Sequence, residues 1–374
     1  VGRIWTDKTV STEDIALTGA DGTITIEKSP EADFLTAFSA LSSTSNLKSK
    51  VAQPLDIVLV LDASGSMDDP MGKSDSTKRI DALKAAANSF IDEIAKQNAS
   101  ISDPAQQHQV SLVKFSGEKS NQVGNDTYRD GGYTYNYSQV MKNLTSCVGS
   151  SADDLKSTVN AIKPAGATRA DYGLQLAADQ TSGREDAKKI VVFFADGSPT
   201  KSSGFEDNVA SSAVSAAKSM KDAGATIYSV GIFGGANPSA DPANNDTSRE
   251  NKFMHAVSSN YPTASYTNQG FIFDNWVWDF GPRATDSDFY KAASNAADLK
   301  TLFDEISQEI TSSTGLPTEV QQGYDPSTSG YITFTDQLGD YMKVDSFTTI
   351  VFAKQLFQNP VKSTSGNVDT YTFS

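Results

Sequence analysis

The sequence contains few of the residues that usually bind soft metals or act as acid–base catalysts. Among its 374 residues there are one cysteine, Cys147, and two histidines, His108 and His255. A single cysteine excludes an internal disulfide bond and any metal cluster held by several cysteines. Two histidines give little support to a histidine-rich zinc site or to a His-dependent mechanism. A metal ion in this protein must therefore be bound mostly by oxygen.

Positive charge and long apolar runs are also scarce. The chain has 31 Lys and Arg against 46 Asp and Glu, a formal net charge of -15. Nucleic acids and anionic membranes bind through Lys and Arg that neutralise phosphates, so we expect no nucleic-acid partner and no membrane insertion. No run of eighteen apolar residues and no signal peptide is present, which predicts a mature or excised soluble fragment.

What the sequence does contain, from Val51 to about Thr311, is an alternation of apolar strands and amphipathic helices. Strands are predicted over 56–62, 109–116, 188–196 and 225–233. Helices are predicted over 151–163, 169–180, 208–224 and 286–310, and around the buried stripe Ile80, Leu83, Ala87, Phe90 and Ile94. Gly224 is expected to end the helix before it. This pattern is typical of an α/β domain with a doubly wound, mostly parallel sheet.

The two flanks show a different pattern. Residues 1–50 and 317–374 alternate with period two and are rich in Thr and aromatics, with strands expected over 3–11, 22–28, 32–41, 330–338, 346–354 and 369–374. Each flank alone has few strands. We therefore predict one β-sandwich, Ig-like or Cna-like, formed by both flanks, with an α/β domain over 51–316 inserted between them. Polar stretches at 43–54 and 311–323 are typical of linkers at these junctions.

Two long segments, about 116–150 and 234–286, interrupt the α/β pattern. Both are rich in aromatic residues. Loops of this length are usually functional or disordered, and the aromatics favour ordered, functional insertions.

Polar residues follow the first core strand in an unusual spacing, "LDASGSMDD". Two interpretations fit poorly. A Walker motif needs four residues between its first glycine and Gly-Lys-Ser, whereas six separate Gly65 from the Gly-Lys-Ser at 72–74. Ser64 or Ser66 as a nucleophile lacks the Gly-x-Ser-x-Gly elbow, and neither histidine lies at a predicted strand end.

A hard divalent cation fits better. Asp62, Ser64 and Ser66 alternate at the carboxyl end of a strand, where open α/β sheets place their ligands. Thr168 precedes a predicted helix, and Asp196 ends another apolar strand. Alone, each of these two residues is an ordinary helix cap or turn former. Together the five supply two carboxylates and three neutral hydroxyls, which suit Mg²⁺.

The set of Asp62-x-Ser64-x-Ser66, Thr168 and Asp196 resembles the metal-ion-dependent adhesion site of von Willebrand factor type A domains. The order of elements matches that family over about residues 51–311. The resemblance implies one divalent cation, with Mg²⁺ favoured and Mn²⁺ or Ca²⁺ as alternatives. It also implies that the cation accepts a carboxylate of the partner and that the protein is an adhesin and no enzyme.

The flanks, with "GRIWTDKTVS", "ADFLTAFSAL" and "GYITFTDQLGDYM", resemble those of type A domains in sortase-assembled surface proteins and tip pilins of Gram-positive bacteria. This implies an extracellular protein, anchored to the cell wall or at a pilus tip. Its expected partners are other pilus subunits and a host or extracellular-matrix protein or glycan that offers an acidic group. Such proteins act in colonisation or virulence.

The two long segments resemble the arms that tip adhesins place around the metal. Ligand contacts are then expected from Tyr133, Tyr135, Trp276 and Trp278, with packing inside each arm as the alternative. Lys8 is a candidate for an isopeptide bond, with Asp336 or Asn367 as possible partners. For Cys147 a buried thiol is favoured over a thioester.

Two other functions remain open from the sequence. One is an intracellular type A module that assists an ATP-driven assembly. The β-rich flanks and the aromatic arms argue against it. The other is a structural pilus subunit whose metal only stabilises a loop, so that metal removal would change stability without changing partner binding.

Overall fold

The chain divides, in this computed structural model, into two compact units. Residues Val1–Lys50 and Leu316–Ser374 form the first, and Val51–Gly315 form the second. The structure describes residues 4–19, 22–42, 54–99, 101, 103–120, 126–285, 287–312, 350–352, 355–357, 361–365 and 368–372.

The described part of the first unit consists of strands. They are β1 (Ile4–Ser11), β2 (Ile15–Gly19), β3 (Gly22–Ile26), β4 (Leu35–Ser42), β15 (Ile350–Phe352), β16 (Gln355–Phe357), β17 (Val361–Ser365) and β18 (Val368–Thr372). They pair antiparallel as β1–β4, β2–β3, β15–β16 and β17–β18. Strands predicted in both flanks are thus confirmed, while the one expected over 330–338 lies outside the described residues. A sandwich that joins the flanks stays a prediction.

The isopeptide prediction also concerns this unit. Lys8 lies in β1, where its backbone is paired opposite Phe38 of β4. Its suggested partners, Asp336 and Asn367, lie outside the described residues. The bond stays a prediction.

The second unit is built on a six-stranded sheet in the order β14-β11-β10-β5-β6-β9. Its strands are β5 (Leu55–Asp62), β6 (Gln109–Phe115), β9 (Gln139–Ser146), β10 (Lys188–Ala195), β11 (Thr226–Gly231) and β14 (Tyr290–Ala292). All neighbours are parallel except β6 and β9. The four predicted core strands are confirmed, and so is the mostly parallel sheet.

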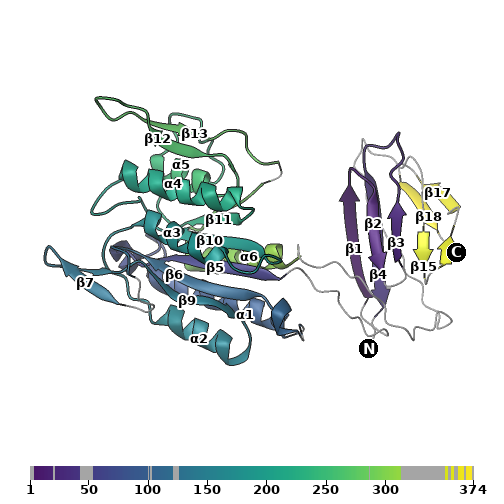
Figure 1. Ribbon diagram of the computed structural model, residues 1–374, viewed down its shortest axis with the longest axis horizontal. Coiled ribbons are helices and arrows are strands. Elements are labelled where there is room, and N and C mark those ends of the chain that lie inside the picture. Colours follow the sequence, from purple (N-terminus) through teal and green to yellow (C-terminus); the bar gives the residue numbers. More distant parts are fainter. Residues whose placement is uncertain are drawn as a thin grey trace. The chain divides into compact units, whose positions relative to one another are not determined.

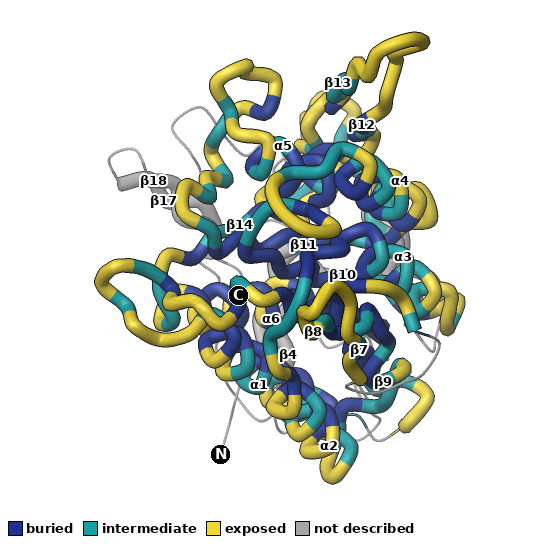
Figure 2. Tube along the Cα trace, turned by 90° about the vertical axis from the view of Figure 1, so that its left-hand side faces the viewer, coloured by how far each residue is buried: buried dark blue, intermediate teal, exposed yellow. Residues whose placement is uncertain are grey.

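Helices cover both faces of this sheet (Figure 1). They are α1 (Arg79–Asn98), α2 (Gly149–Asn160), α3 (Ala170–Thr181), α4 (Asp207–Asp222), α5 (Arg249–Val257) and α6 (Ala296–Ser312), with 3₁₀ helices at Gly65–Asp68 and Pro104–Gln106. Alternate residues of a strand point to opposite faces, so Ile57 and Leu59 join the core under α1, α2 and α6. Val58 and Val60 join the core under α3, α4 and α5. Figure 2 shows the strands as the buried centre of the domain.

Two details of the helix predictions are confirmed. All five residues of the stripe from Ile80 to Ile94 are buried on α1. Gly224 has a φ of 87°, a backbone conformation that glycine adopts readily, and it follows the end of α4. No helix in the described parts of the chain is long and apolar enough to span a bilayer.

The predicted helix over 286–310 is wrong in its first part. Helix α6 starts only at Ala296, and Tyr290–Ala292 forms the edge strand β14 beside β11. The side chain of Tyr290 is fully buried, and its hydroxyl donates to Asn251 Oδ1 over 2.7 Å. Packing and sheet pairing therefore override the helical pattern here, and Asn295 marks the real start by accepting from the backbone N–H of Asp298.

The long segments are only partly excursions from the fold. The first contains β9, the antiparallel edge strand of the main sheet, and the second contains α5, which packs on the sheet. What projects are two hairpins, β7 (Thr127–Asp130) with β8 (Tyr133–Asn136), and β12 (Ser265–Asn268) with β13 (Trp276–Asp279). We call them the first and second arm.

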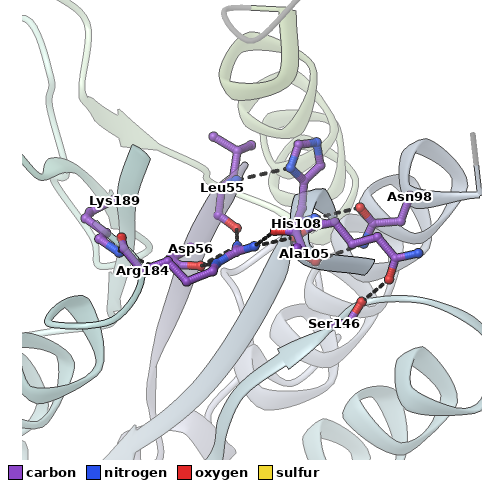
Figure 3. Close-up of polar contacts among 9 residues, drawn as sticks. Leu55, Asp56, Asn98, Ala105, His108, Ser146, Arg184 and Lys189 are labelled. Carbon is purple, nitrogen blue, oxygen red and sulfur yellow. Dashed lines mark hydrogen bonds and ion pairs between the residues drawn. The ribbon is translucent and has the colours of Figure 1, made fainter. Parts of the chain in front are cut away.

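A buried ionic cluster fixes the end of β5 opposite to Asp62 (Figure 3). The side chain of Asp56 is fully buried and accepts from Arg184 Nη2 and Lys189 Nζ, each over 2.6 Å. Nearby, His108 Nδ1 accepts from the backbone N–H of Leu55 over 3.1 Å. Burial, followed by the charge of Arg184, lowers the pKa of His108 to about 4. His108 is thus a neutral structural acceptor.

Cys147 is a structural residue as well. It is fully buried, and its Sγ lies 3.4 Å from the carbonyl oxygen of Ile91. Burial is the main cause that raises the pKa of this thiol to about 12. The sequence favoured a partly buried thiol over a thioester, and the structure contains a free thiol that is fully buried.

We expect the substitution Asp56→Ala to lower the free energy of unfolding by about 3–5 kcal/mol, because it leaves two partly buried cations, Arg184 and Lys189, without their buried counter-charge. Urea unfolding followed by circular dichroism measures this. As a control, Asp222→Ala removes the exposed partner of Lys218 and should cost less than about 1 kcal/mol. Equal losses in the two variants would contradict a special role of the cluster.

Candidate metal-binding site

The topology brings two of the predicted ligands to one edge of the sheet. Asp62 is the last residue of β5, and Asp196 directly follows β10, the parallel neighbour of β5. From β5 the chain continues to β6 on one side and later returns to β10 on the other. The carboxyl ends of β5 and β10 therefore form a topological switch point, the place where open α/β sheets bind their ligands.

Backbone hydrogen bonds join three loops at this edge. The N–H of Gly65 donates to Gly166 O over 2.9 Å, which places the loop before α3 beside the loop after β5. Thr168 and Thr200 exchange two backbone hydrogen bonds of 3.0 and 2.9 Å, which ties the same loop to the one after β10. The structure thus brings all five predicted residues into one cluster of loops.

Hydrogen bonds link four of the five side chains. Ser64 Oγ and Ser66 Oγ lie 3.2 Å apart, and Ser66 Oγ donates to Asp196 Oδ1 over 2.9 Å. Asp62 Oδ1 accepts from the backbone N–H of Ser64 over 2.8 Å. Asp62 Oδ2 accepts from the N–H of Asp196 over 3.3 Å. The fifth residue, Thr168, is buried. It lies in the loop before α3, which is hydrogen-bonded both to the loop after β5 and to the loop after β10.

Two buried carboxylates dominate the electrostatics of the site. Asp62 is fully buried, and no basic side chain in the described part of the chain pairs with it. Burial, and then the negative charge of Asp196, raise the pKa of the Asp62 carboxyl well above its usual value. Two facing carboxylates with neutral hydroxyls between them suit a hard divalent cation. Within the described residues, no three or more His, Cys, Asp and Glu side chains gather in a way that could hold a metal ion, so the candidate site depends on its hydroxyls as well as its two carboxylates.

A basic residue that the sequence did not indicate also reaches the site. Arg79, the first residue of α1, places Nη1 2.9 Å from Asp196 Oδ2. Its side chain is 18% exposed, and that of Asp196 is fully buried. No spacing rule points to Arg79, because it is thirteen residues beyond Ser66 and only folding brings it back.

The first arm begins next to the site. Asn136 Nδ2 donates to Ala63 O over 2.9 Å, and the ring of Tyr135 packs against Gly166. Tyr128 stacks on Tyr135, with ring centroids 5.3 Å apart. Tyr133 at the turn is 72% exposed. Of the two predicted contact residues in this arm, Tyr133 is thus free to meet a partner, whereas Tyr135 supports the arm.

The second arm is similar in build. Trp276 and Trp278 are half-buried and pack on Tyr266, with centroids 5.4 and 3.8 Å away. Both tryptophans therefore hold the arm together, and their predicted ligand contact stays a prediction. Phe271 and Phe273, in the loop that joins β12 to β13, are exposed, 101% and 84%. Figure 2 shows this loop as exposed.

A cavity that sequence reasoning missed opens beside the site. Its volume is about 680 Å³, and it starts at Gly197 and Ser198, directly after Asp196. Asp241, Asp246 and Glu250 also line it. Asp241 and Asp246 come from the segment between β11 and α5, and Glu250 lies in the first turn of α5, so only the fold brings these three acids beside the site.

Comparison with known proteins identifies the α/β unit. Residues 56–269, more than half of the chain, match the von Willebrand factor type A domain family. The chain belongs to this family. The match begins in β5 and ends just beyond β12, so it includes every residue of the candidate site. No curated protein matches the chain.

Solved structures with a type A domain are similar in fold. They include the pilus adhesin SpaC from Lactobacillus rhamnosus GG, with 16% identity over 82% of this chain and 35% of that one, and a TM-score of 0.47. The PilB minor pilin from Streptococcus sanguinis has 16% identity over 82% and 79% of the two chains, with a TM-score of 0.45. Proximal thread matrix protein 1 from the mussel byssus, solved with a zinc-occupied MIDAS motif, has 14% identity over 70% and 49% of the two chains, with a TM-score of 0.42.

We expect Gly166→Ala to destabilise the type A domain by about 2–4 kcal/mol. Gly166 has a φ of 97°, and a Cβ there would lie 2.6 Å from Tyr135 Cδ1 and 2.8 Å from Ser116 Oγ. Urea unfolding measures the loss. Gly204→Ala is the matched control, because Gly204 also has a positive φ but no atom within 4 Å of such a Cβ. A loss no larger than in this control would show that the packing against Tyr135 is unimportant.

Proposed function

We propose that this type A domain is a metal-dependent adhesin. The observation that supports this most directly is the pair of buried carboxylates at the switch point of the sheet, Asp62 and Asp196, where Asp62 Oδ2 accepts from the backbone N–H of Asp196. Both acids are hidden from solvent, so their charges are costly unless a cation compensates them. A His-dependent catalytic mechanism gains no support, because both histidines are buried, with pKa values lowered to about 4 mainly by burial.

In this proposal Asp62, Ser64, Ser66, Thr168 and Asp196 hold the cation. When bound, the cation would supply a position for one carboxylate oxygen of the partner. The loops keep the ligand set in place, since the bonds from Gly65 to Gly166 and between Thr168 and Thr200 fix their spacing. Mg²⁺ is the favoured ion because the ligands are compact and hard, with Mn²⁺ and Ca²⁺ as alternatives.

The arms would make the contact specific. Tyr133 on the first arm and Phe271 with Phe273 on the second expose large rings, and exposed aromatic anchors are frequent hot spots of interfaces. Both arms project from the side of the domain where the parallel strands end (Figure 1). A partner bound at the cation could thus touch the rings as well.

The proposal includes a place outside the cell, on the cell wall or at a pilus tip, with anchoring by sortase and contacts to other pilus subunits. This part rests on the resemblance of the β-rich flanks, in which β1 and β4 were expected and are present. The ligand is an extracellular protein or glycan that offers an acidic group.

The first test is calorimetric titration of the metal-stripped protein with Mg²⁺, Mn²⁺ and Ca²⁺. We expect saturable binding in the wild type and its complete loss in Asp62→Asn, because the variant removes one of only two charged ligands. The Tm of this variant without metal should be equal to or above that of the wild type, since the repulsion from Asp196 is gone. Asp69→Ala, an exposed acid of the same loop, should bind as the wild type does. Cation binding that survives Asp62→Asn would refute the site.

A second test separates the adhesin from a structural pilus subunit. We expect adhesion to immobilised extracellular-matrix proteins to need the cation and to fall at least tenfold in Tyr133→Ser and Phe271→Ser, with the metal Kd unchanged. Surface plasmon resonance with and without EDTA measures this. If EDTA lowers only the Tm and leaves adhesion unchanged, the metal is merely structural.

A further inference from the structure

Arg79 is held in a costly position. Its Nη1 donates to Asp196 Oδ2 over 2.9 Å and lies 3.5 Å from Ser66 O. Its Nε is buried and has no hydrogen-bond partner. An unsatisfied buried donor is unfavourable, so the attraction between Arg79 and Asp196 must offset that penalty.

The neighbouring residue shows that a less costly arrangement exists. Lys78 pairs with Asp68 over 2.8 Å, and these two side chains are 51% and 59% exposed. Arg79 instead turns inward to an acid whose side chain is fully buried. Two adjacent basic residues thus form ion pairs with different acids, one at the surface and one among the candidate metal ligands.

We propose that Arg79 is an internal counter-cation of the metal site, which weakens cation binding and keeps the loaded site positively charged. The inference rests on the proposed function. Asp62 and Asp196 with Arg79 carry a total charge of -1, so a divalent cation brings the site to +1. Without Arg79 the same site would be neutral. Arg79 therefore lowers the affinity of the site for the cation and strengthens the attraction of the loaded site toward an anionic partner.

The test is calorimetry with Mg²⁺ and Mn²⁺ on the wild type, Arg79→Gln and Arg79→Lys. We expect about tenfold tighter binding in Arg79→Gln, as for the removal of one positive charge a few ångströms away. Arg79→Lys keeps the charge and should stay within about twofold of the wild type. Lys78→Gln is the matched control: it removes the neighbouring charge at the surface and should change the affinity less than twofold.

Two readouts do not depend on metal affinity. In EDTA, Arg79→Gln should have a lower Tm than the wild type, because Asp196 loses its counter-charge. With Mg²⁺ bound, trifluoroacetate, a simple carboxylate probe followed by ¹⁹F NMR, should bind more weakly to Arg79→Gln. If this variant does not fold, Arg79→Met, which retains the apolar stem, takes its place.

The outcomes separate this inference from the proposed function. Unchanged or weaker metal binding in Arg79→Gln, with binding still abolished by Asp62→Asn, overturns the role of Arg79 and leaves the metal site standing. Cation binding seen only in Arg79→Gln supports the inference strongly. If neither the wild type nor Arg79→Gln binds a cation, both the inference and the metal-dependent function are wrong.

Discussion

The site depends on one constraint, the electrostatic repulsion between two buried carboxylates that lie close together. Asp62 and Asp196 end neighbouring parallel strands, so the register of the sheet forces them together. Burial, and then the repulsion from Asp196, raise the pKa of the Asp62 carboxyl. Hydroxyls of Ser64 and Ser66 and the guanidinium of Arg79 partly relieve that repulsion. Under the proposed function, a bound cation would compensate the charge that remains.

At the amino end of β5, the charge of another buried acid is compensated by side chains alone. Asp56 is also fully buried, yet it is paired with both Arg184 and Lys189 (Figure 3). One strand thus carries a fully compensated acid at its amino end and an undercompensated acid at its carboxyl end. This contrast within β5 is the basis for treating the Asp56 cluster as structural and for proposing a ligand site at Asp62.

The sequence also predicted elements that the tertiary structure changed. The helical pattern over 286–310 failed where Tyr290 is drawn into the core and its backbone pairs with β11. The polar segment over 116–150 contains β9, an edge strand that the sequence did not predict. Its register to β6 is irregular, and such an irregularity weakens the period-two alternation of polar and apolar residues along a strand. In each case a long-range contact decided the outcome, and local periodicity carries no information about such contacts.

By itself the sequence determined the α/β class, its four core strands and the five candidate ligands, because buried parallel strands have long apolar runs and the ligands follow them at a fixed spacing. Only the tertiary structure decided that Arg79 pairs with Asp196, that the acids Asp241 and Glu250 line a cavity beside the site, and that Trp276 packs inside its arm. Those contacts join residues that are distant along the chain, and their geometry exists only once the sheet and loops have assembled.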